Sequence, residues 1–402
     1  MQNNPKIITQ YWGKIDPLKI EDYLGVGGYA SLKKFIEKMN PPKALREIKS
    51  AKLCGRGGAG FLTGAKWESA MAQKSKEKYF VCNLDESEPG IYKDRMLAEN
   101  NPHLLLEGII ISALTIGAKK AFIYLNGNYE KAKIILEQAI IQAQKNKFLG
   151  SSILKSKYKL KIEIFSGAGA YICGEETALI NSIESNRGEP KIRPPYPTEK
   201  GLFGKPTVVN NAETIANIPW IIQNGGKKFA AIGLKNNPGT KLFILGGAVK
   251  NKGVFEASTE ITIREAIETL GGGLQKGKTF WFAQVGGASG NLYLEKELDS
   301  LVSGAGAILV VDKTVNIYDL LLSWTSFFRR ESCGKCVPCR EGTFRLHEIT
   351  ERLADGEISD RDKEAMLDIF WTLENTTFCP LGKFAAVAMR DAVEKLEIFR
   401  KC

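Results

Sequence analysis

Residues 79–90 read YFVCNLDESEPG, and this stretch decides the class of fold. The apolar run YFVC is typical of a short buried strand. Three acids follow within four residues, Asp85, Glu86 and Glu88. Proteins with α/β folds bind ligands where their strands end. The stretch therefore predicts a ligand-binding strand end, and a solvated acidic loop is the plain alternative.

Strand-like and helical segments alternate around this stretch. AFIYL at 121–125 and KIEIF at 161–165 predict two more strands, while 104–116 and 129–144 have helical periodicity. Such alternation predicts an α/β sheet with helices on both faces.

The rest of the chain changes its pattern twice. Between residues 240 and 312, three strands are predicted in KLFILGG, TFWFAQVGG and AILVVD, with one short helix at 263–270. This is the pattern of a small α+β module. From about residue 316 the chain is helical, and its periodic stretches at 340–354, 360–374 and 383–398 predict a small bundle. Ser359 or Asp360 is expected to cap the second of these helices.

Composition and charge exclude several classes of protein. The 402 residues are 44% hydrophobic and 25% charged, which is ordinary globular composition and excludes disorder as the main state. No apolar run reaches the roughly 18 residues of a membrane span. The N-terminus lacks the apolar core of a signal peptide, so a cytoplasmic location is expected. The net charge of +11 divides into +13 for residues 1–240, +1 for 241–330 and −3 for 331–402.

Four of the eight cysteines have the spacing of metal ligands. Cys333, Cys336 and Cys339 form a C-x2-C-x2-C run, and Cys379 follows forty residues later. This spacing resembles that of four-iron ferredoxins, in which three thiolates on one loop and a fourth from elsewhere bind a 4Fe–4S cluster. A zinc site is the alternative, although zinc usually takes two separated pairs of ligands. Single buried or incidental thiols are expected at Cys54, Cys82, Cys173 and Cys402.

A glycine-rich loop at residues 55–60, GRGGAG, matches the G-x-G-x-x-G pattern. Arg56 and Lys66 flank it, and exposed backbone N–H groups beside cations suit a phosphate. The preceding residues 44–53 have a helical pattern, so an ordinary Rossmann turn is not expected. A purely structural turn remains the alternative.

Two more segments repeat the combination of glycine or asparagine with acids. They are GAGAYICGEET at 167–177 and VVNNAET at 208–214. Acids can accept hydrogen bonds from ribityl or ribose hydroxyls, and asparagine amides can meet a flavin edge.

Five motifs now stand in order along the chain: GRGGAGF-x-TG-x-KW, CN-x-DESEPG-x-x-KDR, GAGAYICGEETAL, GKPT-x-x-NN-x-ET and SCGKC-x-PCREGT. From about residue 20 to 395 the chain closely resembles the NADH-binding flavoprotein subunit of respiratory complex I. That family includes the diaphorase subunits of NAD-linked hydrogenases and formate dehydrogenases.

The resemblance implies a fold and a division into domains. It implies an α/β Rossmann-like domain for FMN and NADH, a small ubiquitin-like α+β module, and a C-terminal helical bundle with the iron–sulfur cluster. The expected ranges are 1–50 for an N-terminal helical segment, 51–235 for the nucleotide domain, 236–315 for the module and 316–402 for the bundle.

The resemblance also implies roles for individual residues. FMN is expected at residues of the glycine loop and of three further segments: Arg56, Gly57, Gly58, Lys66, Asn83, Asp85, Gly174, Glu175, Asn210, Asn211 and Thr214. Four more cofactor-binding residues are expected beside these: Gly55, Gly60, Glu86 and Tyr171. NADH is expected beside Phe61, Glu88, Glu176, Arg193 and Tyr196, with Glu88 and Glu176 positioning the nicotinamide. The cluster is expected on Cys333, Cys336, Cys339 and Cys379. Arg193 and Tyr196 stand where relatives often have Lys and Phe.

The implied reaction is hydride transfer from NADH to FMN, followed by one-electron transfer through the single 4Fe–4S cluster to a partner. A complex I-type NADH:quinone oxidoreductase is the first expectation. A soluble hydrogenase or formate dehydrogenase, which can be electron-bifurcating, is the alternative. The expected partners are a thioredoxin-like 2Fe–2S subunit and a larger iron–sulfur subunit in a hetero-oligomer. The chain itself would not insert into the membrane but could lie peripherally on its inner face through these subunits.

A nucleic-acid-binding module with zinc on the cysteines is the competing class, because residues 1–240 carry +13. The cysteine segment is, however, the acidic part of the chain, and no basic and aromatic residues interleave around it. Nucleic acid is therefore not expected as a partner.

Overall fold

The computed structural model describes residues 5–401, and its contacts divide the chain into two compact units. The first unit comprises the residues up to Ser87, Tyr92–Phe243 and Val254–Glu260. The second comprises Glu88–Ile91, Ile244–Gly253 and the residues from Ile261 onward. Each unit therefore combines segments that are far apart in the sequence.

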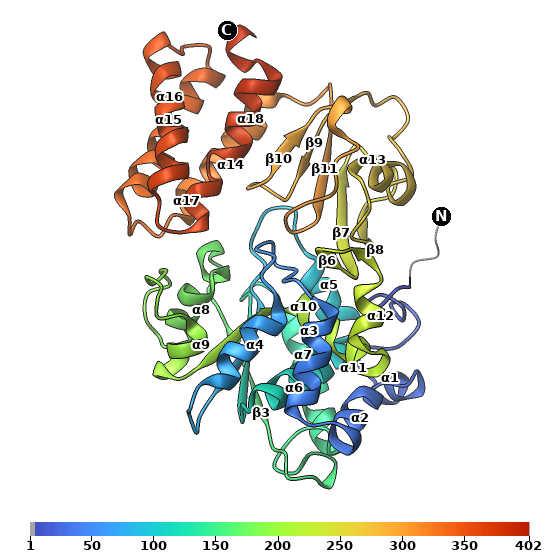
Figure 1. Cartoon of the computed structure of the whole chain (residues 1–402). Helices are drawn as coiled ribbons and strands as arrows, with labels where there is room; N and C mark the ends of the chain where they lie inside the picture. The colour runs from blue at the N-terminus through green and yellow to red at the C-terminus, as the bar shows by residue number, and fades with distance from the viewer. Residues whose placement is uncertain (1–4, 402) are drawn as a thin grey trace. The chain divides into compact units, whose positions relative to one another are not determined.

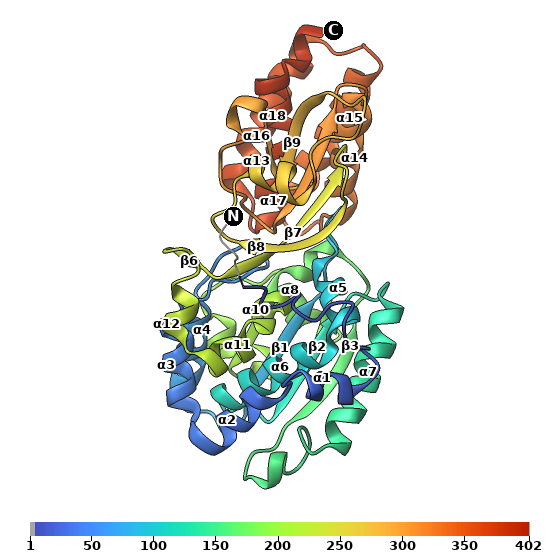
Figure 2. The ribbon, with the colours of Figure 1, turned by 90° about the vertical axis from the view of Figure 1, so that its right-hand side faces the viewer.

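The first unit is built on a sheet of four parallel strands (Figure 2). They are β1 (Tyr79–Leu84), β2 (Lys120–Leu125), β3 (Lys161–Ser166) and β4 (Thr207–Asn211), in the order β3-β2-β1-β4. Because β1 has β2 on one side and β4 on the other, the order reverses between β1 and β4. In open α/β sheets such a switch point is where ligands bind, at the carboxyl ends of the strands.

Helices and short connections surround this sheet. Their bounds are α1 (Ile20–Gly25), α2 (Ala30–Lys38), α3 (Pro41–Ala51), α4 (Thr63–Ala72), α5 (Lys93–Asn100), α6 (Pro102–Ile116), α7 (Glu130–Lys145), α8 (Glu176–Ile183), α9 (Pro197–Lys200), α10 (Ala212–Ala216), α11 (Ile218–Asn224) and α12 (Gly226–Ala230). A two-stranded ribbon, β5 (Gly233–Leu234) with β6 (Asn237–Pro238), follows α12.

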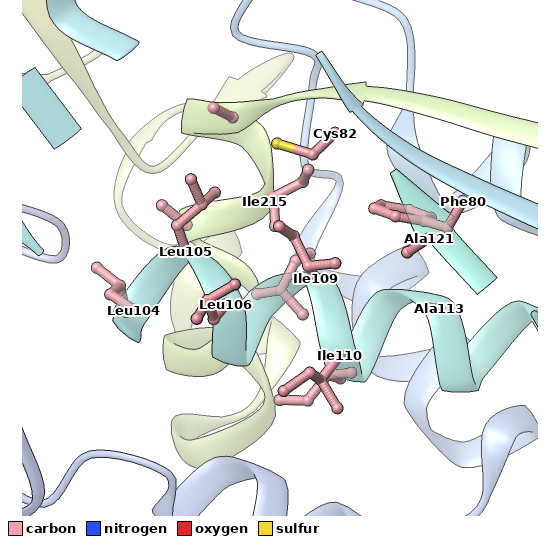
Figure 3. Close-up of a cluster of buried hydrophobic side chains, with 14 of the residues drawn as sticks. Phe80, Cys82, Leu104, Leu105, Leu106, Ile109, Ile110, Ala113, Ala121 and Ile215 are labelled. Carbon is pink, nitrogen blue, oxygen red and sulfur yellow. The ribbon is translucent and has the colours of Figure 1, made fainter. Parts of the chain in front are cut away.

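Helix α6 forms the centre of the core, and all fifteen of its residues are buried. Asn101 caps its first turn by accepting a hydrogen bond from the Leu104 N–H at 3.1 Å. Its leucines and isoleucines pack among Phe80 and Cys82 of β1 and Ile215 of α10 (Figure 3). No helix in the described part of the chain is long and apolar enough to cross a membrane.

Two residues that interrupt the apolar run of α6 have specific partners. The Glu107 carboxylate accepts hydrogen bonds from the Tyr23 hydroxyl at 2.6 Å and from the Tyr29 N–H at 2.9 Å. A Cβ on Gly108 would lie 2.4 Å from the Ile215 carbonyl oxygen, so only glycine allows α10 to approach so closely. Gly108 thereby helps to set the position of α10, whose first turn lies at the switch point.

The second sheet has five strands in the order β10-β9-β11-β7-β8. Its strands are β7 (Thr240–Gly247), β8 (Gly253–Ser258), β9 (Phe280–Val285), β10 (Asn291–Tyr293) and β11 (Ala307–Asp312). Strand β11 pairs in parallel with β7 and antiparallel with β9. The short helix α13 (Ile263–Glu265) continues as a π-type turn over Ala266–Leu270.

The C-terminal part of the second unit is helical, as the periodicity predicts. Its elements are α14 (Ile317–Glu331), α15 (Val337–Ala354), α16 (Asp360–Thr376), α17 (Pro380–Phe384) and α18 (Val387–Leu396). Helices α14, α15, α16 and α18 run alongside one another (Figure 1). Ser359 is the cap of α16, because its side chain accepts a hydrogen bond from the Asp362 N–H at 3.1 Å.

The coarse fold prediction is therefore confirmed: the chain is a mixed α/β protein with a parallel sheet and a helical C-terminal region. The predicted strands at 79–82, 121–125 and 161–165 correspond to β1, β2 and β3. Strands β4, β5, β6, β8 and β10 were not predicted. The first of these matters most, because β4 forms one side of the switch point.

Candidate functional site

Four of the predicted FMN residues meet at the switch point. Asn83 lies near the end of β1 and Asp85 directly follows this strand, while Asn210 and Asn211 end β4. Asn83 and Asn211 are direct partners in the register of the two parallel strands. The structure thus places amide and carboxylate side chains from two distant motifs at one edge of the sheet.

The glycine-rich loop lies against the same edge. The loop is closed by a hydrogen bond from the Gly55 N–H to the Phe61 carbonyl at 2.9 Å. A Cβ on Gly57 would lie 3.3 Å from the Asn211 Cβ, so the loop backbone packs closely on the end of β4. Gly58 has a φ of 108°, a conformation that other residues rarely adopt. The loop joins α3 to α4, so the expectation that it is not a strand-to-helix Rossmann turn is confirmed.

Arg56 points into the protein. Its side chain is 1% exposed, and its guanidinium donates hydrogen bonds to the Asn237 side chain and the Pro238 carbonyl. Burial lowers its pKa, and the nearby Glu213 carboxylate opposes that effect. The Arg56 backbone N–H donates to the Thr214 hydroxyl at 2.8 Å. Arg56 therefore anchors the glycine loop to α10 and to the ribbon, and its contact with a phosphate stays a prediction.

Lys66, Glu176 and Arg193 form a chain of ion pairs. Lys66 Nζ lies 2.7 Å from Glu176 Oε2, and an Arg193 guanidinium nitrogen lies 3.2 Å from Glu176 Oε1. Two aromatic side chains from the predicted NADH set are open to solvent, Phe61 at 58% and Tyr196 at 52% exposed. Open aromatic faces and a paired carboxylate are suited to stacking and hydrogen bonding with a nucleotide.

The loop before α8 contacts the end of β1. The Asn83 amide donates a hydrogen bond to the Gly174 carbonyl at 2.9 Å. Tyr171 and Gly174 are the first and last residues of one short 3-10 helix. The Glu175 carboxylate caps α8 by accepting from the Thr177 and Ala178 N–H groups at 2.9 and 3.0 Å. The structure thus brings this third glycine motif to the switch point.

Four buried charged residues near the site were not singled out from the sequence. They are Lys93, Asp94, Glu213 and Lys241, with exposed fractions of 1%, 3%, 0% and 6%. Burial would lower the pKa of Lys93, but the Asp94, Glu213 and Glu86 carboxylates raise it above its ordinary value. Three of the four lie in motifs quoted above: Lys93 and Asp94 in KDR, and Glu213 in ET. The motifs therefore contained these residues, but nothing in the sequence indicated that they would be buried.

Glu86 belongs to the same buried region. Its carboxylate accepts hydrogen bonds from the Asp94 and Arg95 N–H groups at 3.1 and 3.2 Å. Burial raises the pKa of this carboxyl to about 8; Asp94 adds to the rise, while Lys93 opposes it. Between a pH of about 4.5 and 8 the folded chain therefore holds a proton that the unfolded chain has released, and stability falls as the pH rises.

This linkage gives a testable pH dependence. In FMN-free protein, Glu86→Gln is expected to flatten the decline in the free energy of unfolding between a pH of about 5 and 8, because glutamine does not titrate. Urea unfolding across that range measures it. Glu77→Gln, at a side chain that is 66% exposed, is the control and should keep the wild-type slope. An unchanged slope in Glu86→Gln would show that this carboxyl is ionised throughout the range.

Glu88 has its contacts in the second unit. Its Oε1 accepts hydrogen bonds from the Ser289 N–H at 2.7 Å and from the Ser289 hydroxyl at 2.5 Å. A Cβ on Gly287 would lie 2.7 Å from the Glu88 carboxyl, so the glycine makes room for it. Nothing in the sequence pattern connected Ser289 with Glu88. The predicted role of Glu88 toward nicotinamide stays a prediction.

The four predicted cluster cysteines lie near one another in the second unit. Cys336 immediately precedes α15, Cys339 lies in its first turn, and Cys379 immediately precedes α17. Burial raises the pKa of the Cys339 thiol to about 12, and Cys336, Cys379 and Cys333 add to the rise. Helices α15 and α17 are in contact, which brings the chain at Cys379 to the helix that begins after Cys336.

The assignment of these four thiols to a cluster stays a prediction. Within residues 5–401, no three His, Cys, Asp or Glu side chains are grouped for a single metal ion. A cubane cluster does not need three side chains grouped around one metal ion, because each of its four thiolates binds a different iron. Among the other cysteines, Cys54, Cys82 and Cys173 are buried, as predicted, and Cys402 lies outside the described residues.

Fold and site together define an iron–sulfur flavoprotein. The chain matches the Nuo51 FMN-binding domain over residues 48–220 and the iron–sulfur binding region of NADH-ubiquinone oxidoreductase-F over residues 319–399. It is 43% identical to the F subunit of NADH-quinone oxidoreductase from Aquifex aeolicus over 383 residues, which cover 94% of this chain and 89% of that protein. The chain belongs to the family of NADH-quinone oxidoreductase F subunits, and so it has an FMN-binding domain and a 4Fe–4S binding region.

Hydrogenase subunits are also similar to this chain. It is 40% identical to HndC, a subunit of the NADP-reducing hydrogenase of Solidesulfovibrio fructosivorans, over 94% of this chain and 79% of that protein. A chain in the crystal structure of an NAD+-reducing [NiFe]-hydrogenase in the H2-reduced state superimposes with a TM-score of 0.86 at 30% identity. That match covers 98% of this chain but only 66% of the hydrogenase chain. The relatives therefore include subunits of two kinds of oxidoreductase.

Proposed function

We propose that this chain is the electron-entry subunit of a complex I-type NADH:quinone oxidoreductase, which oxidises NADH and passes electrons to a partner protein. The observation that carries the proposal is the meeting of the glycine loop, the ends of β1 and β4, and the loop before α8 at one switch point. FMN, when bound, supplies the chemistry that divides the two-electron transfer from the donor into one-electron steps.

The residues at the switch point fit a flavin nucleotide. The loop backbone at Gly57 packs closely on Asn211, and we call the space between this loop and the end of β4 the FMN cradle. A side chain at position 57 would fill this cradle. Asn83 and Asn210 supply side-chain amides, and Asp85 supplies a carboxylate for hydroxyl groups. Lys66 would supply positive charge for the phosphate, together with the loop N–H groups. We assign FMN to the full predicted set on this basis.

The NADH residues are assigned by their exposure and charge. Phe61 and Tyr196 would stack on the nucleotide, because both rings are about half exposed or more. Glu176 is held between Lys66 and Arg193, which would orient its carboxylate for the nicotinamide amide. Glu88 keeps its predicted role toward the nicotinamide, and Ser289 fixes its carboxylate.

We assign the predicted domain ranges in the same way, with 1–50, 51–235, 236–315 and 316–402 as N-terminal segment, nucleotide domain, module and bundle. The middle module is proposed to be ubiquitin-like. Its strand order, written from β8 to β10, is second, first, fifth, third and fourth along the chain, and its first and last strands are parallel. This mixed sheet, in which the first and last strands are parallel neighbours, supports the ubiquitin-like assignment.

The electron acceptor is proposed to be a larger iron–sulfur subunit, with a thioredoxin-like 2Fe–2S subunit beside it. The names of the relatives describe subunits, which supports a hetero-oligomer. Attachment through these subunits would place the chain peripherally on the inner face of the membrane. A soluble NAD(P)-linked hydrogenase is the second candidate, and the TM-score of 0.86 with a hydrogenase chain favours it.

Spectroscopy and activity of the purified chain test the proposal. Anaerobically purified and reconstituted protein should show flavin absorption and should reduce ferricyanide with NADH. A preparation that binds no FMN and is inert to NADH after reconstitution would overturn the function. Subunits that co-purify from the native cell separate the candidates: membrane subunits support complex I, and a [NiFe] subunit supports the hydrogenase.

A further inference from the structure

A buried ion pair lies directly behind Asn211, one of the residues assigned to FMN. Lys93 and Asp94 begin α5 with exposed fractions of 1% and 3%, and Lys93 Nζ lies 2.9 Å from Asp94 Oδ1. Glu213, in the first turn of α10 and fully buried, lies 3.0 Å from the same Nζ. A lone charge at this depth would be costly, so these groups depend on one another.

Both oxygens of the Asp94 carboxylate act as acceptors. Oδ1 accepts from Lys93 Nζ and from the Glu213 N–H at 3.2 Å. Oδ2 accepts from the Asn211 Nδ2 at 2.6 Å. An asparagine at position 94 has only one acceptor oxygen, so it would turn an N–H group toward a donor whichever way it faced.

The Asn211 side chain is fixed at both of its polar ends. Its Oδ1 accepts from the Glu213 and Thr214 N–H groups at 3.0 and 3.4 Å, while its Nδ2 donates to Asp94. The amide cannot exchange its oxygen and nitrogen without losing these bonds. One of its two N–H groups is used by Asp94, and the other remains for a ligand.

We propose that Asp94 is a positioning residue, which holds the Asn211 amide as a hydrogen-bond donor toward FMN while Lys93 balances its charge. The inference rests on the proposed assignment of Asn211 to FMN. It gives a role to two buried residues that the proposed function does not use. Their charges also act on the bound flavin, because buried charges are only weakly screened.

The first test compares FMN affinity in the full chain. Asp94→Asn is expected to raise the FMN dissociation constant about tenfold or more, as loss of a charged hydrogen bond does. The effect should disappear when Asn211 is already alanine, since Asp94 acts through it. Glu107→Gln is the control, because Glu107 is an equally buried carboxylate bonded to Tyr23 and Tyr29, and it should leave FMN affinity unchanged.

The second test uses the flavin midpoint potential, which a purely structural role would not move in a charge-dependent way. Asp94→Asn removes a negative charge and should raise the potential, because reduction adds negative charge to the flavin. Lys93→Met removes a positive charge and should lower it. Potential shifts of the same sign in the two variants, or an Asp94→Asn effect on FMN affinity that persists in Asn211→Ala, would overturn the proposal.

A swapped pair keeps the test decisive if Asp94→Asn does not fold. In Asp94→Asn with Asn211→Asp every donor meets an acceptor again, so the fold should recover, but the N–H offered to FMN is lost and affinity should stay low. Wild-type FMN affinity in the swapped chain would contradict the proposal. If the wild-type chain itself fails to bind FMN, the proposed function fails instead.

Discussion

Cys336→Ser is expected to abolish the iron–sulfur cluster and to leave FMN binding intact. The wild-type chain is expected to hold about four irons and four acid-labile sulfides, and the variant close to none, since a cubane loses stability when one of its thiolates is removed. Reduction of ferricyanide by NADH should continue at the flavin. Transfer to an iron–sulfur partner should fall about 100-fold or more, because the one-electron route is cut.

The control for this result is Cys54→Ser. Cys54 is buried and its thiol donates to the Asn236 carbonyl at 3.4 Å, which a serine hydroxyl can also do. Iron and sulfide analysis should give wild-type content. Full iron content in Cys336→Ser, or loss of iron in Cys54→Ser, would contradict the ligand set of Cys333, Cys336, Cys339 and Cys379.

Gly57→Val closes the FMN cradle. A Cβ at Gly57 already lies 3.3 Å from the Asn211 Cβ, and the two methyl groups of valine add volume where the loop meets β4. Overpacking of this kind costs about 1–3 kcal/mol, so the FMN dissociation constant should rise about 10- to 100-fold. Fluorescence titration of the FMN-free chain measures it.

A matched glycine separates cradle filling from general damage. Gly25 ends α1, is exposed, and has no heavy atom within 4 Å of an added Cβ. Gly25→Val should therefore bind FMN as the wild type does. Equal affinities in Gly57→Val and wild type would mean that FMN does not use this loop.

The sequence predicted the elements that carry local signals. The strand YFVC and the acids after it, the glycine loop, and the C-x2-C-x2-C run all lie within short windows. Strand β4 was missed because Thr207–Asn211 follows a proline-rich loop and ends in two asparagines, which are rare in strands. Its burial depends on pairing with β1, a long-range contact that no local pattern encodes.

The burial of the charged residues near the site was not predicted, for a similar reason. Lys93 and Asp94 have the composition of a solvated helix start, and only their pairing with Glu213 allows them to be buried. The guanidinium of Arg56 contacts Asn237 and Pro238, which lie far along the chain, and no local pattern indicated these partners. A charged side chain is buried only where the tertiary fold brings partners to it, and the local sequence does not reveal those partners.

The division into two units has a consequence for how this protein can be inherited and engineered. The backbone passes from one unit to the other five times, after Ser87, Ile91, Phe243, Gly253 and Glu260. A cut after Glu260 leaves every segment of the first unit on one fragment, but it separates Glu88–Ile91 and Ile244–Gly253 from the rest of the second unit. We therefore expect that the cluster-bearing unit cannot be moved to another protein as the C-terminal fragment alone.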